Sequence, residues 1–143
     1  MQKESLEYNN KVLDHYRNPR NFGVLRGANR TGEELNPLCG DDYELFLKTE
    51  AGGKVADASF TGQGCAISKA SASMLTTLIR GKTMAEVKKI KDDFLNLVTC
   101  GRWPEDTSAE LKKIRAFEGI RKFPIRVKCA TLIWHALDEA LKR

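Results

Sequence analysis

The chain has 143 residues and a mass of 16.1 kDa, with 41% hydrophobic and 30% charged residues, a composition typical of one soluble globular domain. No apolar run approaches the roughly 20 residues of a membrane-spanning helix. Residues 1–5 lack the apolar core of a signal peptide. We therefore expect a single domain over residues 1–143, cytoplasmic and without a membrane partner, where cysteines are usually thiols or metal ligands.

The first half of the chain predicts one helix followed by strands. Residues 4–17 place apolar side chains near helical spacing and end before Asn18-Pro19, which predicts a helix. Residues 42–48 alternate in part, and residues 55–61 follow a glycine-rich turn, which predicts a β-hairpin. Residues 26–35 are the weakest element of the pattern and are expected to add a third strand.

The second half predicts helices. After Cys65 the apolar residues keep helical spacing up to Gly81, and Thr83-Met84-Ala85-Glu86 then has the form of a capping box that opens the next helix. The expected helices cover residues 67–81, 84–98, 108–117 and 124–141, the last beginning at Pro124. Strands followed by helices predict an α+β domain, in which several helices pack on a small antiparallel sheet of about three strands.

The basic charge raises the question of nucleic-acid binding. The formal net charge is +5 and the pI is about 9.1. The 24 Lys and Arg residues are scattered among 19 acidic ones, however, and no helix-turn-helix or zinc-finger pattern is present. We interpret these charges as a solvated surface and expect no nucleic-acid partner.

Three of the four cysteines lie at turns or helix starts, where thiols can converge on a metal ion. Cys39 and Asp41 flank a glycine, which permits the tight backbone that brings thiol and carboxylate together. Cys65 directly precedes a predicted helix, whose positive dipole end stabilises a thiolate. Cys129 lies three residues after Arg126, whose charge lowers the pKa of a thiol on the same helix face.

If Cys39, Asp41, Cys65 and Cys129 bind one ion, the donor set is three sulfurs and one oxygen, which suits tetrahedral zinc. A carboxylate is the most exchangeable ligand of such a set, so we expect a labile site. The alternative interpretation is a set of small buried or inert thiols, because the chain has no closely spaced Cys-x-x-Cys pair. Cys100 is assigned to that second class.

Four segments together resemble the iron–sulfur cluster assembly family that contains the IscU scaffolds, the NifU N-terminal domain and the SufU proteins. They are DHYRNPRNFG at residues 14–23, NPLCGD at 36–41, GQGCAISKASAS at 62–73 and RVKC at 126–129. The resemblance covers nearly the whole chain and implies a SufE/NifU-like fold. Lys128 replaces a histidine of the IscU scaffolds, a single proline precedes it, and the stretch around residues 95–118 is longer. All three departures resemble the SufU branch.

The resemblance to SufU implies a zinc-containing sulfurtransferase that accepts persulfide sulfur from a pyridoxal-phosphate cysteine desulfurase of the SufS type. By position, Cys39 would accept the sulfur, Asp41, Cys65 and Cys129 would hold zinc with it, and Arg126 would assist. Iron–sulfur assembly proteins would be the downstream partners. The alternative is an IscU-like scaffold, not an enzyme, that builds a [2Fe–2S] cluster on the same residues. A third interpretation is structural zinc in a binding module without chemistry.

Overall fold

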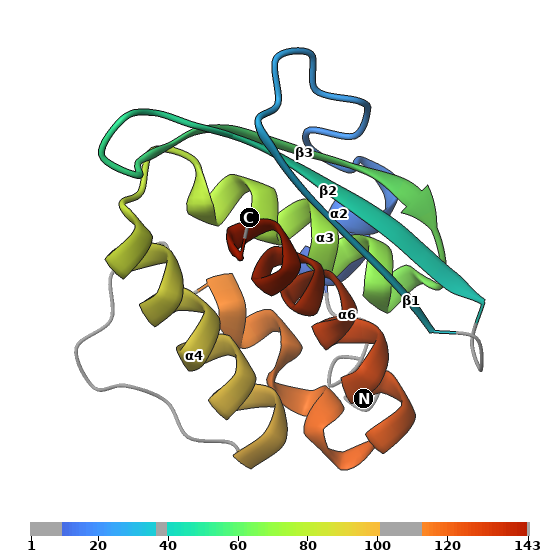
Figure 1. Ribbon diagram of the computed structural model, residues 1–143. Helices are drawn as coiled ribbons and strands as arrows, with labels where there is room; N and C mark the ends of the chain where they lie inside the picture. Colours follow the sequence, from blue (N-terminus) through green and yellow to red (C-terminus); the bar gives the residue numbers. More distant parts are fainter. Residues whose placement is uncertain (1–9, 37–39, 101–112, 143) are drawn as a thin grey trace.

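A three-stranded sheet lies on one side of the molecule, and the helices lie on the other (Figure 1). The computed structural model describes residues 10–36, 40–100 and 113–142. Within these ranges no helix combines the length and the apolar character that crossing a membrane requires. The expected α+β class, with helices packed on a small antiparallel sheet, is confirmed.

The strands are β1 (Arg30–Asn36), β2 (Asp41–Thr49) and β3 (Val55–Gln63). They follow one another in the order β1-β2-β3, and both pairs are antiparallel. All three predicted strands are present, the first shifted toward its C-terminal end. The register pairs Asp41 with Asn36 and Asp42 with Gln63, so the start of β2 lies beside the ends of both neighbours.

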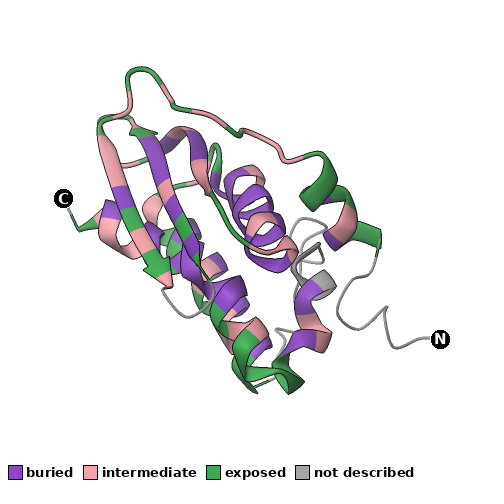
Figure 2. Cartoon of the chain, turned by 90° about the vertical axis from the view of Figure 1, so that its right-hand side faces the viewer, coloured by how far each residue is buried: buried purple, intermediate pink, exposed green. Residues whose placement is uncertain are grey.

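Strand β2 alternates between the helix-covered face and the outer face of the sheet. Tyr43, Leu45 and Leu47 are almost fully buried, and so is Asp41 at the start of the same row. Asp42 and Lys48 are exposed. Because the side-chain period of a strand is two, this register points the Asp41 carboxylate toward the helices. Figure 2 shows that buried positions concentrate where the strands face the helices.

The helices are α2 (Asn10–Arg17), α3 (Ala66–Ile79), α4 (Met84–Cys100), the 3-10 helix η1 (Lys113–Lys122) and α6 (Pro124–Leu141). Helices α3 and α6 match their predictions closely, and α4 continues past Val98 to Cys100. The helix expected over 108–117 differs, because the described helix there is of the 3-10 type and runs to Lys122. The predicted N-terminal residues 4–9 and residues 108–112 lie outside the described residues.

Helix α6 packs on the sheet next to α3, which itself contacts β3, and most residues from Cys129 to the end of the helix are buried. Its contacts reach β1, β2, α3, α4 and η1. Gly32 on β1 permits the close approach, because a Cβ there would lie only 1.9 Å from the carbonyl oxygen of Ala136. Trp134 stacks on Phe94 of α4, with 4.6 Å between the ring centroids. The residues of α6 near Cys129 are therefore held from several sides.

The DHYRNPRNFG segment, which begins within α2, is hydrogen-bonded to α3. The ring nitrogen Nδ1 of His15 lies 2.7 Å from the Ser73 hydroxyl, which also accepts the backbone N–H of Arg20 at 2.8 Å. His15 and Ser73 are both buried. This first motif of the family resemblance therefore has a structural role in the described part of the chain.

Candidate metal centre

Asp41 opens strand β2 immediately after Gly40, which has a φ of 73°. This left-handed backbone favours glycine and turns the chain from β1 into β2. The Asp41 side chain is fully buried although it carries a carboxylate. A buried carboxylate is costly unless it is hydrogen-bonded or bound to a cation, so its surroundings indicate its function.

Cys65 is the N-cap residue of α3, with an extended backbone. Its sulfur accepts the backbone N–H of Ser68 at 3.4 Å, so the thiol occupies the capping position that a serine or aspartate usually takes. The amide of Cys65 itself donates to Oδ1 of Asp41 at 3.1 Å. The start of the helix and the start of the strand are thereby fixed against each other.

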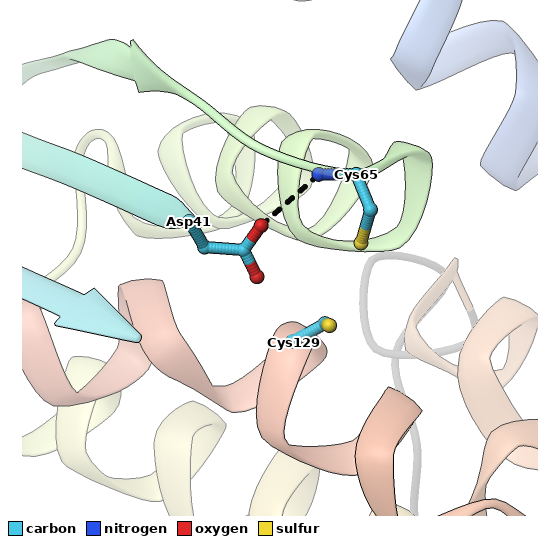
Figure 3. Close-up of side chains that lie close together, drawn as sticks. All are labelled: Asp41, Cys65 and Cys129. Carbon is cyan, nitrogen blue, oxygen red and sulfur yellow. Dashed lines mark hydrogen bonds between the residues drawn. The ribbon is translucent and has the colours of Figure 1, made fainter. Parts of the chain in front are cut away.

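Cys129 comes from α6 and is 2% exposed. Figure 3 shows its sulfur, the sulfur of Cys65 and the Asp41 carboxylate converging from three separate elements. One ligand atom of each residue lies within 4.8 Å of the others. Donors of a tetrahedral zinc site are about 3.8 Å apart, since Zn–S bonds are about 2.3 Å long, so an ion would draw these donors together only slightly.

Two observations show that this donor set fits a metal cation. Oδ2 of Asp41 is buried without a hydrogen-bond partner in the described part of the chain, while Oδ1 is used by the Cys65 amide. Burial, together with the neighbouring Cys65 and Asp41, strongly raises the pKa of the Cys129 thiol in the absence of a cation. A bound cation supplies both the missing partner and the charge that thiolates need.

Gly64 lets the Asp41 carboxylate and the Ser68 hydroxyl approach the backbone just before Cys65. A Cβ there would lie 2.4 Å from Oδ1 of Asp41 and 2.5 Å from the hydroxyl oxygen of Ser68. No role was predicted for this glycine, because a close approach between distant segments leaves no local signal in the sequence. Ser68 was likewise assigned no role, although its position three residues after a helix-starting cysteine is where an N-cap accepts its hydrogen bond.

The structure therefore brings together Asp41, Cys65 and Cys129 from the predicted ligand set. Cys39 lies outside the described residues. Arg126 is partly buried one helical turn before Cys129, and Lys128 is exposed on the same helix. Cys100 is exposed at the end of α4 and is absent from this cluster.

Comparison with known proteins gives one family and several relatives. The family model for the NifU-like N terminal domain matches residues 7–140. The chain is 41% identical to the zinc-dependent sulfurtransferase SufU of Bacillus subtilis, covering 95% of this chain and 90% of that protein. It is 39% identical to the iron-sulfur cluster assembly scaffold protein IscU of Streptococcus pyogenes, covering 92% of this chain and 80% of that protein.

Solved structures agree with these matches. One, described as a candidate iron–sulfur cluster assembly scaffold for the SUF system of Fervidobacterium islandicum, superposes with a TM-score of 0.85 at 29% identity, covering 97% of this chain and 98% of that one. A NifU-like N-terminal protein from Brucella abortus shares the fold, with a TM-score of 0.84 at 22% identity, covering 96% and 94% of the two chains.

Proposed function

The chain belongs to the family of NifU-like N-terminal domains, which act in iron–sulfur cluster assembly, and from this premise we propose that it is a zinc-dependent sulfur acceptor for a cysteine desulfurase. It takes sulfur as a persulfide and passes it to downstream iron–sulfur assembly proteins. The reaction needs free thiols, so we assign it to the reducing environment of the cytoplasm.

The observation that carries this proposal is the buried Asp41, Cys65 and Cys129 cluster, with one carboxylate oxygen left unpartnered among the described residues. Three donors leave one position of a tetrahedral ion for a further ligand, and we assign it to Cys39. Lys128 supports the sulfur-acceptor branch, because its exposed ammonium is a poor metal ligand. The 41% identity to a SufU protein supports zinc.

In this proposal Asp41, Cys65 and Cys129 would hold the ion, and Cys39 would be the ligand that is released. A carboxylate is otherwise the most easily exchanged ligand of the set, but here the Cys65 amide anchors Asp41 through Oδ1. Zinc, when bound, keeps thiols deprotonated at neutral pH. The Cys39 thiolate attacks the terminal sulfur of the desulfurase persulfide. A new S–S bond forms on Cys39, the S–S bond of the desulfurase breaks, and the desulfurase cysteine leaves as a thiolate. The sulfur changes carriers without net oxidation, and Arg126 offsets the negative charge near the site.

The test is alanine production by the partner desulfurase in the presence of reductant, with increasing amounts of the zinc-loaded protein. We expect a large, saturable rise in turnover that Cys39→Ala abolishes. Cys100→Ala is the matched control, because it removes a cysteine that lies outside the cluster. A flat response with the wild-type protein would contradict the proposal.

A second candidate function is an IscU-like scaffold for a [2Fe–2S] cluster. It is favoured by the 39% identity to a streptococcal IscU and by a cysteine-rich donor set that also suits such a cluster. Reconstitution with iron and sulfide, followed by transfer of the cluster to an apo-protein, separates the two functions. Stable assembly and transfer without desulfurase stimulation would favour the scaffold.

A further inference from the structure

Behind the three ligands, a buried chain of hydrogen bonds joins β2 to α3. The hydroxyl of Ser68 donates to the carbonyl oxygen of Cys65 at 3.0 Å, and the hydroxyl of Tyr43 lies 3.1 Å from the same Ser68 oxygen. Since Ser68 has a single hydroxyl proton and directs it to Cys65, Tyr43 is the donor to Ser68. Tyr43 and Ser68 are each 1% exposed, so water does not compete for these bonds.

Ser68 also contacts the metal-ligating side chain directly. Its backbone N–H donates to the sulfur of Cys65 at 3.4 Å. Ser68 thus holds Cys65 at two points, the sulfur and the carbonyl oxygen. A Cβ at Gly64 would lie 2.5 Å from the Ser68 hydroxyl oxygen, so only glycine leaves room for this arrangement. A shift of Ser68 would therefore move the thiol relative to Asp41.

Two hydrogen bonds, side by side, connect β2 to the start of α3. Asp41 and Tyr43 lie two residues apart on the inner face of β2, and Cys65 and Ser68 lie three apart at the start of α3. One connection is the 3.1 Å hydrogen bond from the Cys65 amide to Asp41, and the other is the Tyr43–Ser68 bond. A single connection would act as a pivot, whereas two prevent the helix start from rotating against the strand.

We propose that Tyr43 and Ser68 are positioning residues of the metal centre, which keep Cys65 at a fixed distance from Asp41. The inference rests on the proposed function, in which a fourth ligand leaves and returns. With Cys65 and Asp41 held by the fold, Asp41, Cys65 and Cys129 would retain the ion when the fourth ligand is released. Outer hydrogen bonds of this kind typically change metal affinity about 10- to 100-fold.

The variants Tyr43→Phe and Ser68→Ala test this role. Tyr43→Phe removes the hydroxyl and leaves the ring in the core. We expect each variant to bind Co²⁺ about 10- to 100-fold more weakly, measured by competition with a chromophoric chelator, with altered thiolate-to-cobalt absorption bands. Because both substitutions remove the Tyr43–Ser68 hydrogen bond, the double variant Tyr43→Phe/Ser68→Ala should lose less affinity than the sum of the two single losses.

Thr76→Val is the matched control. Thr76 is a buried hydroxyl residue on the same helix, roughly three turns beyond Cys65, and its hydroxyl donates to the carbonyl oxygen of Ser73. We expect this variant to lower the free energy of unfolding and to leave Co²⁺ affinity and spectrum unchanged. An equal loss of affinity in Thr76→Val, or wild-type Co²⁺ binding by Tyr43→Phe and Ser68→Ala, would overturn the inference.

Failure of the inference and failure of the proposed function give different results. Co²⁺ affinity does not depend on sulfur transfer. If the wild-type protein does not stimulate a desulfurase but Tyr43→Phe still weakens Co²⁺ binding, the function is wrong and the positioning role stands. If desulfurase stimulation depends on Cys39 while both variants bind Co²⁺ normally, the proposed function stands and the positioning role is wrong.

Discussion

At the scale of single residues, the two carboxylate oxygens of Asp41 have different roles. Oδ1 accepts the Cys65 amide and so joins strand to helix, and Oδ2 remains buried without a partner among the described residues. An isolated carboxylate in this position would be destabilising, because a buried charge without a partner costs several kcal/mol. Binding of a cation removes that cost, so the residue is suited to a site that is loaded with metal.

We predict that Asp41→Ala lowers Zn²⁺ affinity at least about tenfold, because it removes a direct donor and the anchor of the Cys65 amide. Zinc competition with a chromophoric chelator measures this. Asp42→Ala is the control, since Asp42 is the next residue along β2 but is exposed on the outer face. Equal zinc affinity in Asp41→Ala and the wild type would show that the carboxylate is not a ligand.

At the scale of elements, the metal centre depends on where β2, α3 and α6 begin. Asp41 is the first residue of β2, Cys65 caps α3, and Cys129 lies in the first half of α6. Start positions are set locally by a glycine turn, by capping and by Pro124. The residues that begin these elements therefore place each ligand along its own element, and the packing of the elements brings the three ligands together.

The capping box of α4 offers a test of local helix chemistry away from the site. The Thr83 amide donates to the Glu86 carboxylate at 2.9 Å, and the Glu86 amide donates to the Thr83 hydroxyl at 3.2 Å, as the sequence predicts. We expect Thr83→Ala to reduce the free energy of unfolding by about 1 kcal/mol, as measured by urea unfolding, with no change in zinc affinity.

The same box predicts a pH dependence. The hydrogen bond from the Thr83 amide lowers the pKa of Glu86 below its ordinary value of 4.5. A carboxylate whose pKa is lowered by folding stabilises the folded state at any pH above its ordinary pKa. That contribution is lost as the pH falls through the lowered pKa. The difference in unfolding free energy between wild type and Glu86→Gln should therefore be present at neutral pH and shrink in acid. A difference independent of pH would contradict this assignment.

At the scale of the whole molecule, the hydrophobic core extends well beyond the metal centre. The core joins the sheet to α3, α4, η1 and α6 through large buried side chains such as Trp134, Phe94 and Phe60. Of the three ligands, Cys129 belongs to this core and Cys65 packs against it. A protein with such a core differs from a zinc finger, whose folding free energy comes mainly from the metal.

We predict that removing zinc with a chelator leaves the fold intact. The far-UV circular dichroism spectrum should be retained and thermal unfolding should stay cooperative, while Tm falls because a ligand that binds only the folded state stabilises it. Added zinc should restore the original Tm. Loss of cooperative unfolding in the zinc-free protein would instead support zinc as a structural staple.

Much of the fold could be predicted from the sequence. The period of apolar residues located α3 and α6, and the capping box located the start of α4, because these signals act within a few residues. The helix expected over residues 108–117 was given too early an end and was assigned no type. Its described part is a 3-10 helix ending at Lys122, and nothing local to those residues distinguished the two.

The sequence by itself determined the residue types of the site, because a thiol at a helix start and a carboxylate beside a glycine turn are recognisable from the few residues around them. Only the tertiary structure decided that Asp41, Cys65 and Cys129 meet, that one oxygen of Asp41 is left for a cation, and that Tyr43 and Ser68 support the cluster. These relations join segments 20 to 90 residues apart. Their geometry is set by strand register and by the packing of α6 against Gly32, which no local pattern encodes.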